Sequence, residues 1–562
     1  MDKIWLKSYP KGVPAEIDLN EFKSIGQMFE KSVRQFADRT AYVCMDKGIT
    51  YGELDKLTRD FAAYLQSVAK LPKGSRIAIM MPNCLQYPIC LYGALRAGYT
   101  VVNTNPLYTP HELEYQLKDS GADAIVILEN FAHVLQKVLP AVPVKHVIVT
   151  SLGEMLGFPK GGIVNLVVRH VKKMVPAWDL PNHKSFKDVL AAGAKADLKP
   201  VEVTHDDVAF LQYTGGTTGV AKGAMLTHRN IVANLQQAHA WLKPFLSKDA
   251  EIIITALPLY HIFALTANGL VFFKIGAKNI LITNPRDIPH FCKELHKYKF
   301  SAITGVNTLF NALLNNPDFA KLDFSALRIS LGGGMAVQKA VADKWKKVTG
   351  RTLVEAYGLT ETSPAATMNP LDLPDYNGSI GLPISSTEVA IRDDDGKDLG
   401  IGETGEICIR GPQVMKGYYK RPEETAKVMF ADGFLRTGDV GIVDEKGFVR
   451  IVDRKKDMIN VSGFNVYPNE VEAEVALHPG VLEVAAVGVP DEKSGETVKI
   501  FVVKKDPNLT AEALIAHCKQ NLTGYKVPKH VEFRTELPKT NVGKILRRAL
   551  RDEKSAKATK AA

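Results

Sequence analysis

The stretch YTGGTTGVAKGAMLTHRN, residues 213–230, decides the fold that the sequence predicts. The run VAFLQY before it predicts a β-strand, and RNIVANLQQ, from residue 229, predicts a helix. Between them lie glycines, threonines and one lysine: Thr214, Gly215, Gly216, Thr217, Thr218, Gly219, Lys222 and Gly223. Glycines let backbone N–H groups close around an anion, hydroxyls donate hydrogen bonds, and a lysine adds positive charge. This composition predicts a polyphosphate-binding loop, although not a Walker A loop, because glycine follows Lys222. The alternative is a glycine-rich turn without a ligand.

The first 200 residues predict alternating strands and helices. Expected strands cover residues 77–83, 99–106 and 123–128, and expected helices cover residues 85–98 and 113–122. Such alternation predicts parallel sheets with helices on their faces, so the fold class is α/β.

The composition changes near residue 453. Shorter elements follow, with strands expected at 484–490 and 498–505 and a helix at 511–522. We therefore expect a large multi-sheet domain over residues 1–453 and a small α+β domain over residues 454–562, joined by a charged hinge. The basic, alanine-rich end, residues 547–562, predicts a frayed tail.

Three further stretches contain candidate site residues. In EAYGLTETSP, residues 355–364, Glu361 lies among hydroxyls and could hold Mg²⁺, and Tyr357 could stack on a flat base. In residues 434–468, Asp439 could accept ribose hydroxyls and Arg454 could reach ribose or phosphate. In LPKTNVGKILRR, residues 537–548, Gly543 leaves Lys544 free to approach a ligand. Taken singly, each also fits a bland alternative: a loop glutamate with a packed tyrosine, a turn aspartate, a solvated charge run, or a surface lysine.

Composition limits the partners and the compartment. The 562 residues include 71 Lys and Arg against 61 Asp and Glu, a net charge of +10, which fits anionic partners. No nucleic-acid recognition motif appears, so we expect no nucleic-acid partner. Six cysteines without a CxxC pair argue against a disulfide scaffold or zinc site, and the start has no secretory h-region, so we expect a cytoplasmic protein. The uncharged run at residues 252–273 predicts a buried strand and helix rather than a membrane span.

These blocks, in this order and spacing, resemble the adenylate-forming superfamily, which contains acyl- and aryl-CoA synthetases, peptide-synthetase adenylation domains and beetle luciferases. The resemblance covers nearly the whole chain. Within the superfamily the chain is most similar to bacterial long-chain-fatty-acid–CoA ligases, through NPLYTPHELEYQLKDSGA (105–122), LPLYHIFALT (257–266), NPRDIPHF (284–291), TGVNTLFNALLNN (304–316) and VSGFNVYPNEVE (461–472).

The resemblance implies roles for the matching residues. The phosphate loop would comprise Tyr213, Thr214, Gly215, Gly216, Thr217, Thr218, Gly219, Val220, Ala221, Lys222 and Gly223. Around the nucleotide, Gly333 and Gly334 would border adenine and the acyl carboxylate, Tyr357 would stack on adenine, Thr360 would touch the α-phosphate, Glu361 would hold Mg²⁺, and Asp439 and Arg454 would bind ribose. In the small, mobile domain, Lys544 would be the adenylation lysine, Gly463 would line the pantetheine channel, and the hinge would lie at Lys455 and Lys456.

The implied activity is that of a long-chain-fatty-acid–CoA ligase. ATP would activate the fatty acid as acyl-AMP with release of pyrophosphate, coenzyme A would then take the acyl group, and the product would serve β-oxidation. Alternatives are a medium-chain or aryl-CoA ligase, a fatty acyl-AMP ligase that loads a carrier protein, and a non-catalytic binding module. Against the carrier-loading enzyme, no insertion separates DRKKDMI from VSGFNVYP. A homodimer is a further expectation.

Some apolar segments allow two interpretations. The run from Ile262 to Phe273, with residues 304–314, could wall an acyl tunnel or be ordinary core, and His261 could approach the acyl carboxylate or be a core histidine. Residues 163–175, IVNLVVRHVKKMV, have an apolar stripe at helical spacing beside Arg169, Lys172 and Lys173. Such a helix could lie on the anionic inner face of a membrane, or it could pack its apolar face on the core.

Overall fold

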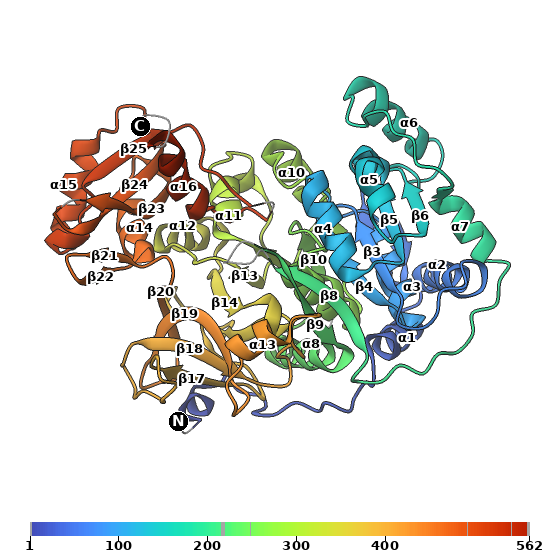
Figure 1. Cartoon of the computed structure of the whole chain (residues 1–562), viewed down its shortest axis with the longest axis horizontal. Coiled ribbons are helices and arrows are strands. Elements are labelled where there is room, and N and C mark those ends of the chain that lie inside the picture. Colours follow the sequence, from blue (N-terminus) through green and yellow to red (C-terminus); the bar gives the residue numbers. More distant parts are fainter. Residues whose placement is uncertain (1–2, 215–219, 248, 492, 541, 559–562) are drawn as a thin grey trace.

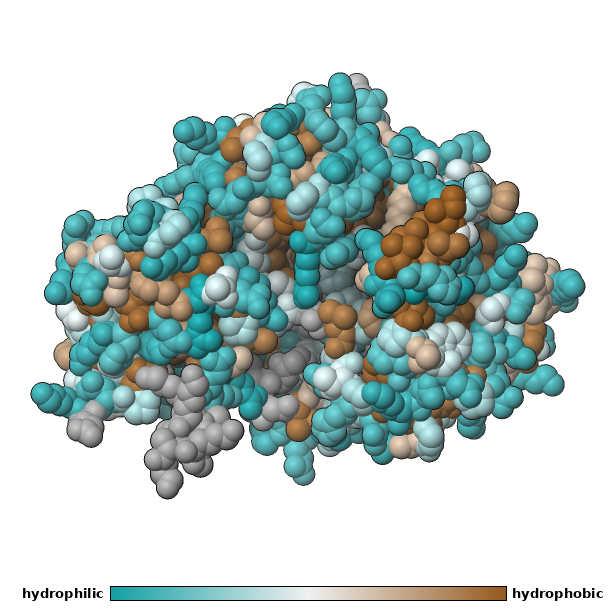
Figure 2. Space-filling model, turned by 90° about the horizontal axis from the view of Figure 1, so that it is seen from above, coloured by the Kyte–Doolittle hydropathy of each residue, from teal (hydrophilic) through white to brown (hydrophobic). Residues whose placement is uncertain are grey.

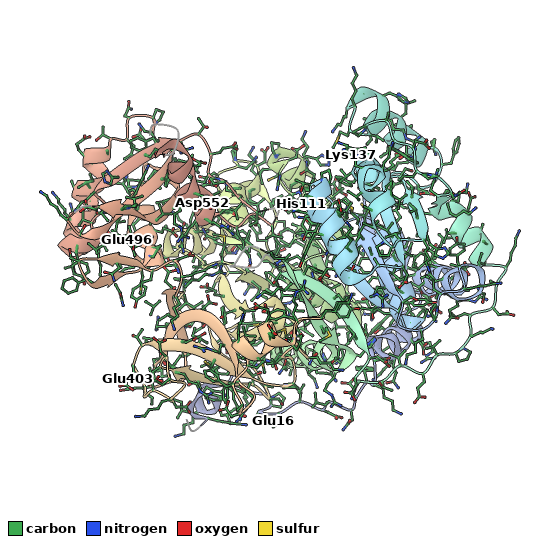
Figure 3. All side chains as sticks on the ribbon, in the orientation of Figure 1. Glu16, His111, Lys137, Glu403, Glu496 and Asp552 are labelled. Carbon is green, nitrogen blue, oxygen red and sulfur yellow. The ribbon has the colours of Figure 1, made fainter. Side chains whose placement is uncertain are left out.

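The computed structural model describes residues 3–214, 220–247, 249–491, 493–540 and 542–558. Within these ranges the strands form four sheets, two central and two toward the C-terminus (Figure 1). Charged residues such as Glu16 and Glu403 lie at the periphery (Figure 3). The predicted α/β class with several sheets is confirmed.

The first central sheet contains the alternating elements that the sequence predicts. Its order is β7 (Lys184–Ser185), β6 (His146–Thr150), β5 (Ala124–Leu128), β3 (Arg76–Met80), β4 (Thr100–Asn103), β8 (Val208–Thr214) and β9 (Lys222–Thr227). Strands β3, β4 and β5 pair in parallel, with α3 (Gln86–Arg96) and α4 (Pro110–Ser120) between them in the chain. Successive residues of β5, and of β3 after Arg76, are apolar and buried on both faces of the sheet. This pattern is typical of parallel strands in a sheet that is covered by helices on both sides.

The predicted phosphate loop lies in a hairpin. Strands β8 and β9 pair antiparallel, so the loop joins two strands, and α8 (His228–Leu242) follows β9. The helix expected from residue 229 is present as α8, and β9 between the loop and that helix is a strand that was not predicted from the sequence. The run KGAMLT forms a strand because it buries Gly223, Ala224, Leu226 and Thr227.

The second central sheet runs β16 (Leu382–Pro383), β15 (Ala365–Met368), β14 (Val354–Gly358), β13 (Ile329–Gly333), β12 (Ala302–Gly305), β10 (Ile252–Thr255), β11 (Lys278–Leu281), β1 (Thr40–Cys44) and β2 (Lys47–Thr50). The uncharged run forms β10, then α9 (Ile262–Ala264) and η7 (Leu265–Phe272), all largely buried, as predicted. Among the described helices, none has the length and apolarity needed to cross a membrane. Both central sheets contribute to one hydrophobic cluster, so they share a core.

Other helices cover these sheets: α1 (Ile25–Gln35), α2 (Tyr51–Ala63), α5 (Ala132–Val138), α7 (Phe186–Gly193), α10 (Ile288–Leu295), α11 (Asn307–Leu314) and α12 (Lys339–Thr349).

Two smaller sheets follow. The first runs β17 (Glu388–Arg392), β18 (Gly405–Arg410), β19 (Leu435–Val443) and β20 (Val449–Arg454), and α13 (Pro422–Val428) lies between β18 and β19 in the chain. The second contains β21 (Ile459–Val461), β22 (Phe464–Val466), β23 (Val481–Asp491), β24 (Gly495–Lys504) and β25 (His530–Arg534), with α14 (Pro468–Ala476) and α15 (Ala511–Asn521). We refer to residues 454–562 as the small domain, and that boundary stays a prediction.

The end of the chain corrects one expectation. Residues predicted as a frayed tail form α16 (Arg547–Ala558). Leu550 is buried against β23, and Arg547 binds Glu472 at 2.6 Å and Asp453 at 3.3 Å. These partners come from distant parts of the chain, so local composition could not reveal them.

The predicted amphipathic helix is present with a change of register. Helix α6 (Lys160–Leu166) continues into a π-helical turn, η5 (Val167–Val171), and ends before Pro176. The expected apolar stripe therefore divides: Val168 is buried, while Val171 and Met174 are exposed. The alternative that the whole stripe packs on the core was wrong for that exposed part.

Candidate active site

The two ends of the predicted phosphate loop are fixed on α4. Tyr213 donates a hydrogen bond to Asp119 at 2.7 Å, and Tyr115 donates one to the Ala221 carbonyl at 2.8 Å. Tyr213 pairs with Gly223 across the hairpin, and a Cβ at Gly223 would lie 3.2 Å from the tyrosine ring. A side chain at position 223 would therefore press on the tyrosine ring, which favours glycine there.

The middle of the loop, Gly215, Gly216, Thr217, Thr218 and Gly219, lies outside the described residues. Thr214 ends β8 opposite Lys222, and Val220 is exposed. Thr214 on β8 and Lys222 on β9 therefore lie side by side at the two ends of the predicted loop.

Lys222, the lysine of the predicted phosphate loop, is held from two sides. Lys222 forms an ion pair with Glu424 on α13, and its Nζ lies 5.2 Å from the centre of the Tyr418 ring. Its ammonium therefore has both an ionic and a cation–π partner. Neither partner was among the residues that the sequence suggested.

Glu361 lies near that lysine on the short helix η9 (Thr360–Thr362). Its carboxylate accepts a hydrogen bond from Tyr418 at 2.6 Å. The neighbouring Thr362 and Ser363 hydroxyls are buried and donate to the backbone carbonyls of Pro364 and Gln413, respectively. Among the described residues, no group of three or more His, Cys, Asp and Glu side chains is placed to hold a metal ion.

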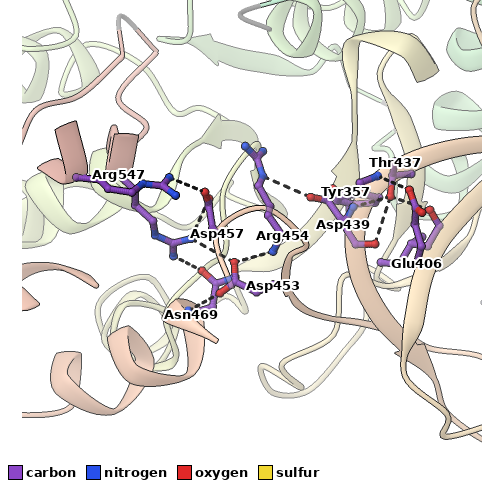
Figure 4. Close-up of polar contacts among 12 residues, drawn as sticks. Tyr357, Glu406, Thr437, Asp439, Asp453, Arg454, Asp457, Asn469 and Arg547 are labelled. Carbon is purple, nitrogen blue, oxygen red and sulfur yellow. Dashed lines mark hydrogen bonds and ion pairs between the residues drawn. The ribbon is translucent and has the colours of Figure 1, made fainter. Parts of the chain in front are cut away.

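The predicted base and ribose residues meet between β14 and β19. Tyr357 donates a hydrogen bond to Asp439 at 2.6 Å, and Arg454 lies 3.4 Å from the same carboxylate (Figure 4). Asp439 and Arg454 are partners in the β19–β20 pairing, which explains their proximity. Burial raises the pKa of Asp439, while the Arg454 charge opposes that rise. The three side chains form one polar cluster, in which Asp439 is buried and Arg454 is exposed.

Lys544 comes to this cluster from the small domain. Its Nζ lies 3.6 Å from where a Cβ at Gly334 would be, directly after β13, so a side chain there would crowd the lysine. Lys539 and Ile545 pair antiparallel, so Lys544 lies in a hairpin. Thr308 on α11 donates a hydrogen bond to the Gly543 carbonyl at 2.8 Å, which holds this hairpin against α11. Lys544 is therefore placed between Gly334 and the Asp439 cluster.

Burial and the nearby Arg454 charge lower the pKa of Lys544 to about 8, although Asp439 opposes the shift. Burial and the Lys544 charge also lower the pKa of His261 to about 3, so His261 is neutral at pH 7. Its Nδ1 accepts a hydrogen bond from the Phe263 N–H at 3.3 Å. At pH 7, Lys544 is therefore cationic and His261 is neutral.

Comparison with known proteins identifies the family of this site. Residues 29–419 match the family described as AMP-binding enzyme, and residues 470–544 match its C-terminal domain. The chain belongs to the AMP-binding enzyme family. The predicted resemblance is confirmed.

Individual relatives are similar over almost their full length. The chain is 60% identical to a long-chain-fatty-acid–CoA ligase of Yersinia pestis, with 98% of each chain covered. It is 56% identical to a protein of the same description from Haemophilus influenzae, with 100% of each covered. The solved structure of ATP-bound MatB from Rhodopseudomonas palustris is 28% identical, with a TM-score of 0.81, covering 94% of this chain and 98% of that one. An anthranilate CoA ligase structure, 24% identical with a TM-score of 0.85 and coverage of 97% and 100%, supports the fold.

One predicted residue of this AMP-binding enzyme lies apart from the others. Gly463 occupies an exposed turn between β21 and β22, with a φ of 86°. A Cβ there would meet nothing within 4 Å, so open space surrounds it. The assignment of Gly463 to a pantetheine channel stays a prediction.

The position of Lys544 predicts a pH dependence for the AMP-binding enzyme. Because its folded-state pKa is lowered to about 8, the ammonium is present below that pH and is lost as the pH rises through it. We expect kcat/KM for adenylate formation, which reports the free enzyme, to fall about tenfold per pH unit well above pH 8. ATP–pyrophosphate exchange from pH 6 to 10 measures this, and a flat profile to pH 10 would contradict it.

Proposed function

We propose that this chain is a long-chain-fatty-acid–CoA ligase of the AMP-forming type. The observation that carries the proposal is Lys544 beside Gly334 and the Tyr357–Asp439 cluster, because a nucleotide binder without chemistry needs no lysine there. Relatives 56% to 60% identical over nearly the full chain, described as long-chain-fatty-acid–CoA ligases, support the substrate. β-oxidation as the destination of the product and the homodimer remain predictions.

The first half-reaction joins two anions. The carboxylate oxygen of the fatty acid attacks the α-phosphorus of ATP, the bond to the bridging oxygen breaks, and pyrophosphate leaves with that electron pair. Lys222 would neutralise the β- and γ-phosphates, and Lys544 would bridge the carboxylate and the α-phosphate. Tyr357 would position the base, Asp439 would position the ribose, and Thr360 would position the α-phosphate.

Mg²⁺ would fit beside this loop. The Glu361 carboxylate is oriented by the Tyr418 hydroxyl, and a single carboxylate completed by phosphate oxygens and water is how proteins commonly bind this ion. When bound, the ion supplies charge neutralisation at the phosphates. Thr362 and Ser363 are fully buried, so we assign the ion to the Glu361 carboxylate and not to these two hydroxyls.

The second half-reaction uses the mixed anhydride. The coenzyme A sulfur attacks the acyl carbon, the thiol proton is lost, and AMP departs with the electron pair of the broken C–O bond. Lys544 occupies the place near the acyl carbon, so the thiol needs a different arrangement of the small domain. We place that change at Lys455 and Lys456, with Gly463 brought toward the site.

The hydrocarbon site would begin at Phe263. Its ring lies 3.2 Å from where a Cβ at Gly333 would be, next to the expected acyl carboxylate. The buried helix η7 continues from there with the apolar residues Leu265, Leu270, Val271 and Phe272. An apolar wall at this place supports a long hydrocarbon substrate.

The test is AMP release with ATP and Mg²⁺ across acids from acetate to oleate, with and without coenzyme A. Coenzyme-A-dependent turnover that peaks with long-chain acids supports the proposal. Turnover with short or aromatic acids only would overturn the substrate and keep the mechanism. Turnover that needs a carrier protein instead of coenzyme A would favour the carrier-loading alternative. Absence of turnover with every acid would contradict an enzymatic function.

We also propose that the segment around α6 docks on an anionic membrane surface, where fatty acids partition. The supporting residues are apolar and outward-facing: Phe158 is 99% exposed, Ile163 59%, Leu166 57%, Val171 67% and Met174 55%. Lys172 and Lys173 are exposed beside them. Figure 1 shows α6 standing out from the body, and Figure 2 shows hydrophobic residues gathered in this region.

A paired substitution tests this docking. Because burying each aliphatic side chain is worth about 1.5–3 kcal/mol, Ile163→Glu with Leu166→Glu should lower binding to phosphatidylglycerol vesicles at least tenfold. Co-sedimentation measures the bound fraction, and Ile401→Glu, at an exposed residue near β18, is the control. Equal pelleting of the wild type and the paired variant would contradict the proposal.

A further inference from the structure

Residues 415–418 connect the two parts of the phosphate site. Gly417 accepts a hydrogen bond from the Met225 N–H at 2.9 Å, and Lys416 donates one to the Met225 carbonyl at 3.0 Å, so the segment lies along β9. The Met415 N–H donates to the Glu361 carbonyl at 2.8 Å. One short segment is therefore bonded to the strand of the phosphate loop and to the loop of Glu361.

Tyr418 extends this connection through its side chain. Its hydroxyl donates to Glu361 at 2.6 Å, and its ring lies under the Lys222 ammonium, 5.2 Å from Nζ to the ring centre. The residue is only 8% exposed, so these contacts are made away from bulk water. A single tyrosine thus contacts both residues that we assign to the polyphosphate and its ion.

The tyrosine is itself fixed. Its backbone N–H donates to Thr425 on α13 at 2.9 Å, and Thr425 in turn donates to the Arg421 carbonyl at 3.0 Å. Gly417 before it has a φ of 142°, and a Cβ there would lie 3.0 Å from Thr425. The backbone from which the Tyr418 ring extends is therefore held in place.

We propose that Tyr418 is a positioning residue for nucleotide activation. The hydroxyl aims the Glu361 carboxylate at the Mg²⁺ that accompanies ATP, and the ring holds the Lys222 ammonium toward the phosphates. A partner that orients a ligating carboxylate contributes to ion affinity without touching the ion. This inference rests on the proposed function, because that proposal assigns Glu361 and Lys222.

Two substitutions separate the roles of the hydroxyl and the ring. Tyr418→Phe removes the donor and keeps the ring, so we expect half-saturating Mg²⁺ in ATP–pyrophosphate exchange to rise about tenfold. The ATP KM at saturating Mg²⁺ should stay within about twofold of wild type, because the cation–π contact remains. Tyr418→Leu removes both, and the ATP KM should then rise several-fold as well.

Tyr419→Phe is the matched control. This neighbouring ring packs on the hydrophobic cluster around Leu211, and its substitution should change neither quantity. Transfer from supplied acyl-adenylate to coenzyme A should be unchanged in every variant, since no polyphosphate takes part in it. That half-reaction also shows that each variant is folded.

The outcomes are distinct. A Tyr418→Phe enzyme with the Mg²⁺ curve of the wild type overturns the inference, and so does a uniform loss of exchange that Mg²⁺ does not restore. If the wild type itself shows exchange that is independent of Mg²⁺, the assignment of Glu361 fails and the inference fails with it. If the wild type depends on Mg²⁺ and only the Tyr418 variants need more of it, the inference is supported.

Discussion

Replacing Lys544 with alanine is expected to lower the rate of acyl-adenylate formation about 100- to 1000-fold. The reason is that this ammonium lies beside Gly334 and near Asp439, where it can bridge the attacking carboxylate and the α-phosphate. Transfer from supplied acyl-adenylate to coenzyme A should change less than about threefold, because that step forms no bond to phosphorus. ATP–pyrophosphate exchange and thioester formation measure the two steps separately.

The same hairpin offers a control for this prediction. Lys539 carries the same charge but binds Glu483 at 2.7 Å, away from Gly334 and Asp439, so Lys539→Ala should leave exchange nearly unchanged. Lys544→Arg keeps the charge with a much higher pKa, and any residual exchange should lose the decline above pH 8. Equal losses of both half-reactions in Lys544→Ala would show damage to folding and would contradict the assigned role.

The sequence predicted the sheet of the first 200 residues because its signal is local. Strand β5 is apolar along its whole length and β3 is apolar after Arg76, and the start of α4 is marked by the capping residue Thr109. Features set by distant partners were missed. The KGAMLT run became β9 because β8 and residues 415–418 offer it hydrogen bonds from both sides.

The candidate site shows the same limit. Motif residues were predicted to converge, and Tyr357, Asp439, Arg454 and Lys544 lie together. Their supporting partners were not predicted, since Tyr418 is 57 positions from Glu361 and Glu424 is 202 from Lys222. The stretch GYYKRPEET, residues 417–425, contained a signal in its adjacent tyrosines and its helix start with proline and two glutamates. No local pattern indicates which carboxylate that tyrosine reaches.

Proline at position 455 is expected to separate the half-reactions in the opposite sense from Lys544→Ala. Asp457 donates its N–H to the Arg454 carbonyl at 3.0 Å, so residues 454–457 form a turn with Lys455 in its second position, where proline is favoured. Arg454 ends β20, and such an extended residue is compatible with a following proline. The substitution removes one hydrogen bond, from the Lys455 N–H to the Gly438 carbonyl at 3.0 Å. Adenylate formation should therefore stay within about threefold of wild type.

Thioester formation should instead fall at least about tenfold in Lys455→Pro, because a fixed φ resists the rotation that brings coenzyme A to the acyl carbon. Arg547 must also exchange its bond to Asp453 on β20 during that rotation, so the observed arrangement already has its own restraint (Figure 4). Lys455→Ala is the control, since it removes the same exposed ion pair with Asp394 and leaves φ free. Single-turnover measurements of both steps decide the matter. If the two steps fall in parallel, or neither changes, the turn at residues 454–457 is not the hinge of that rearrangement.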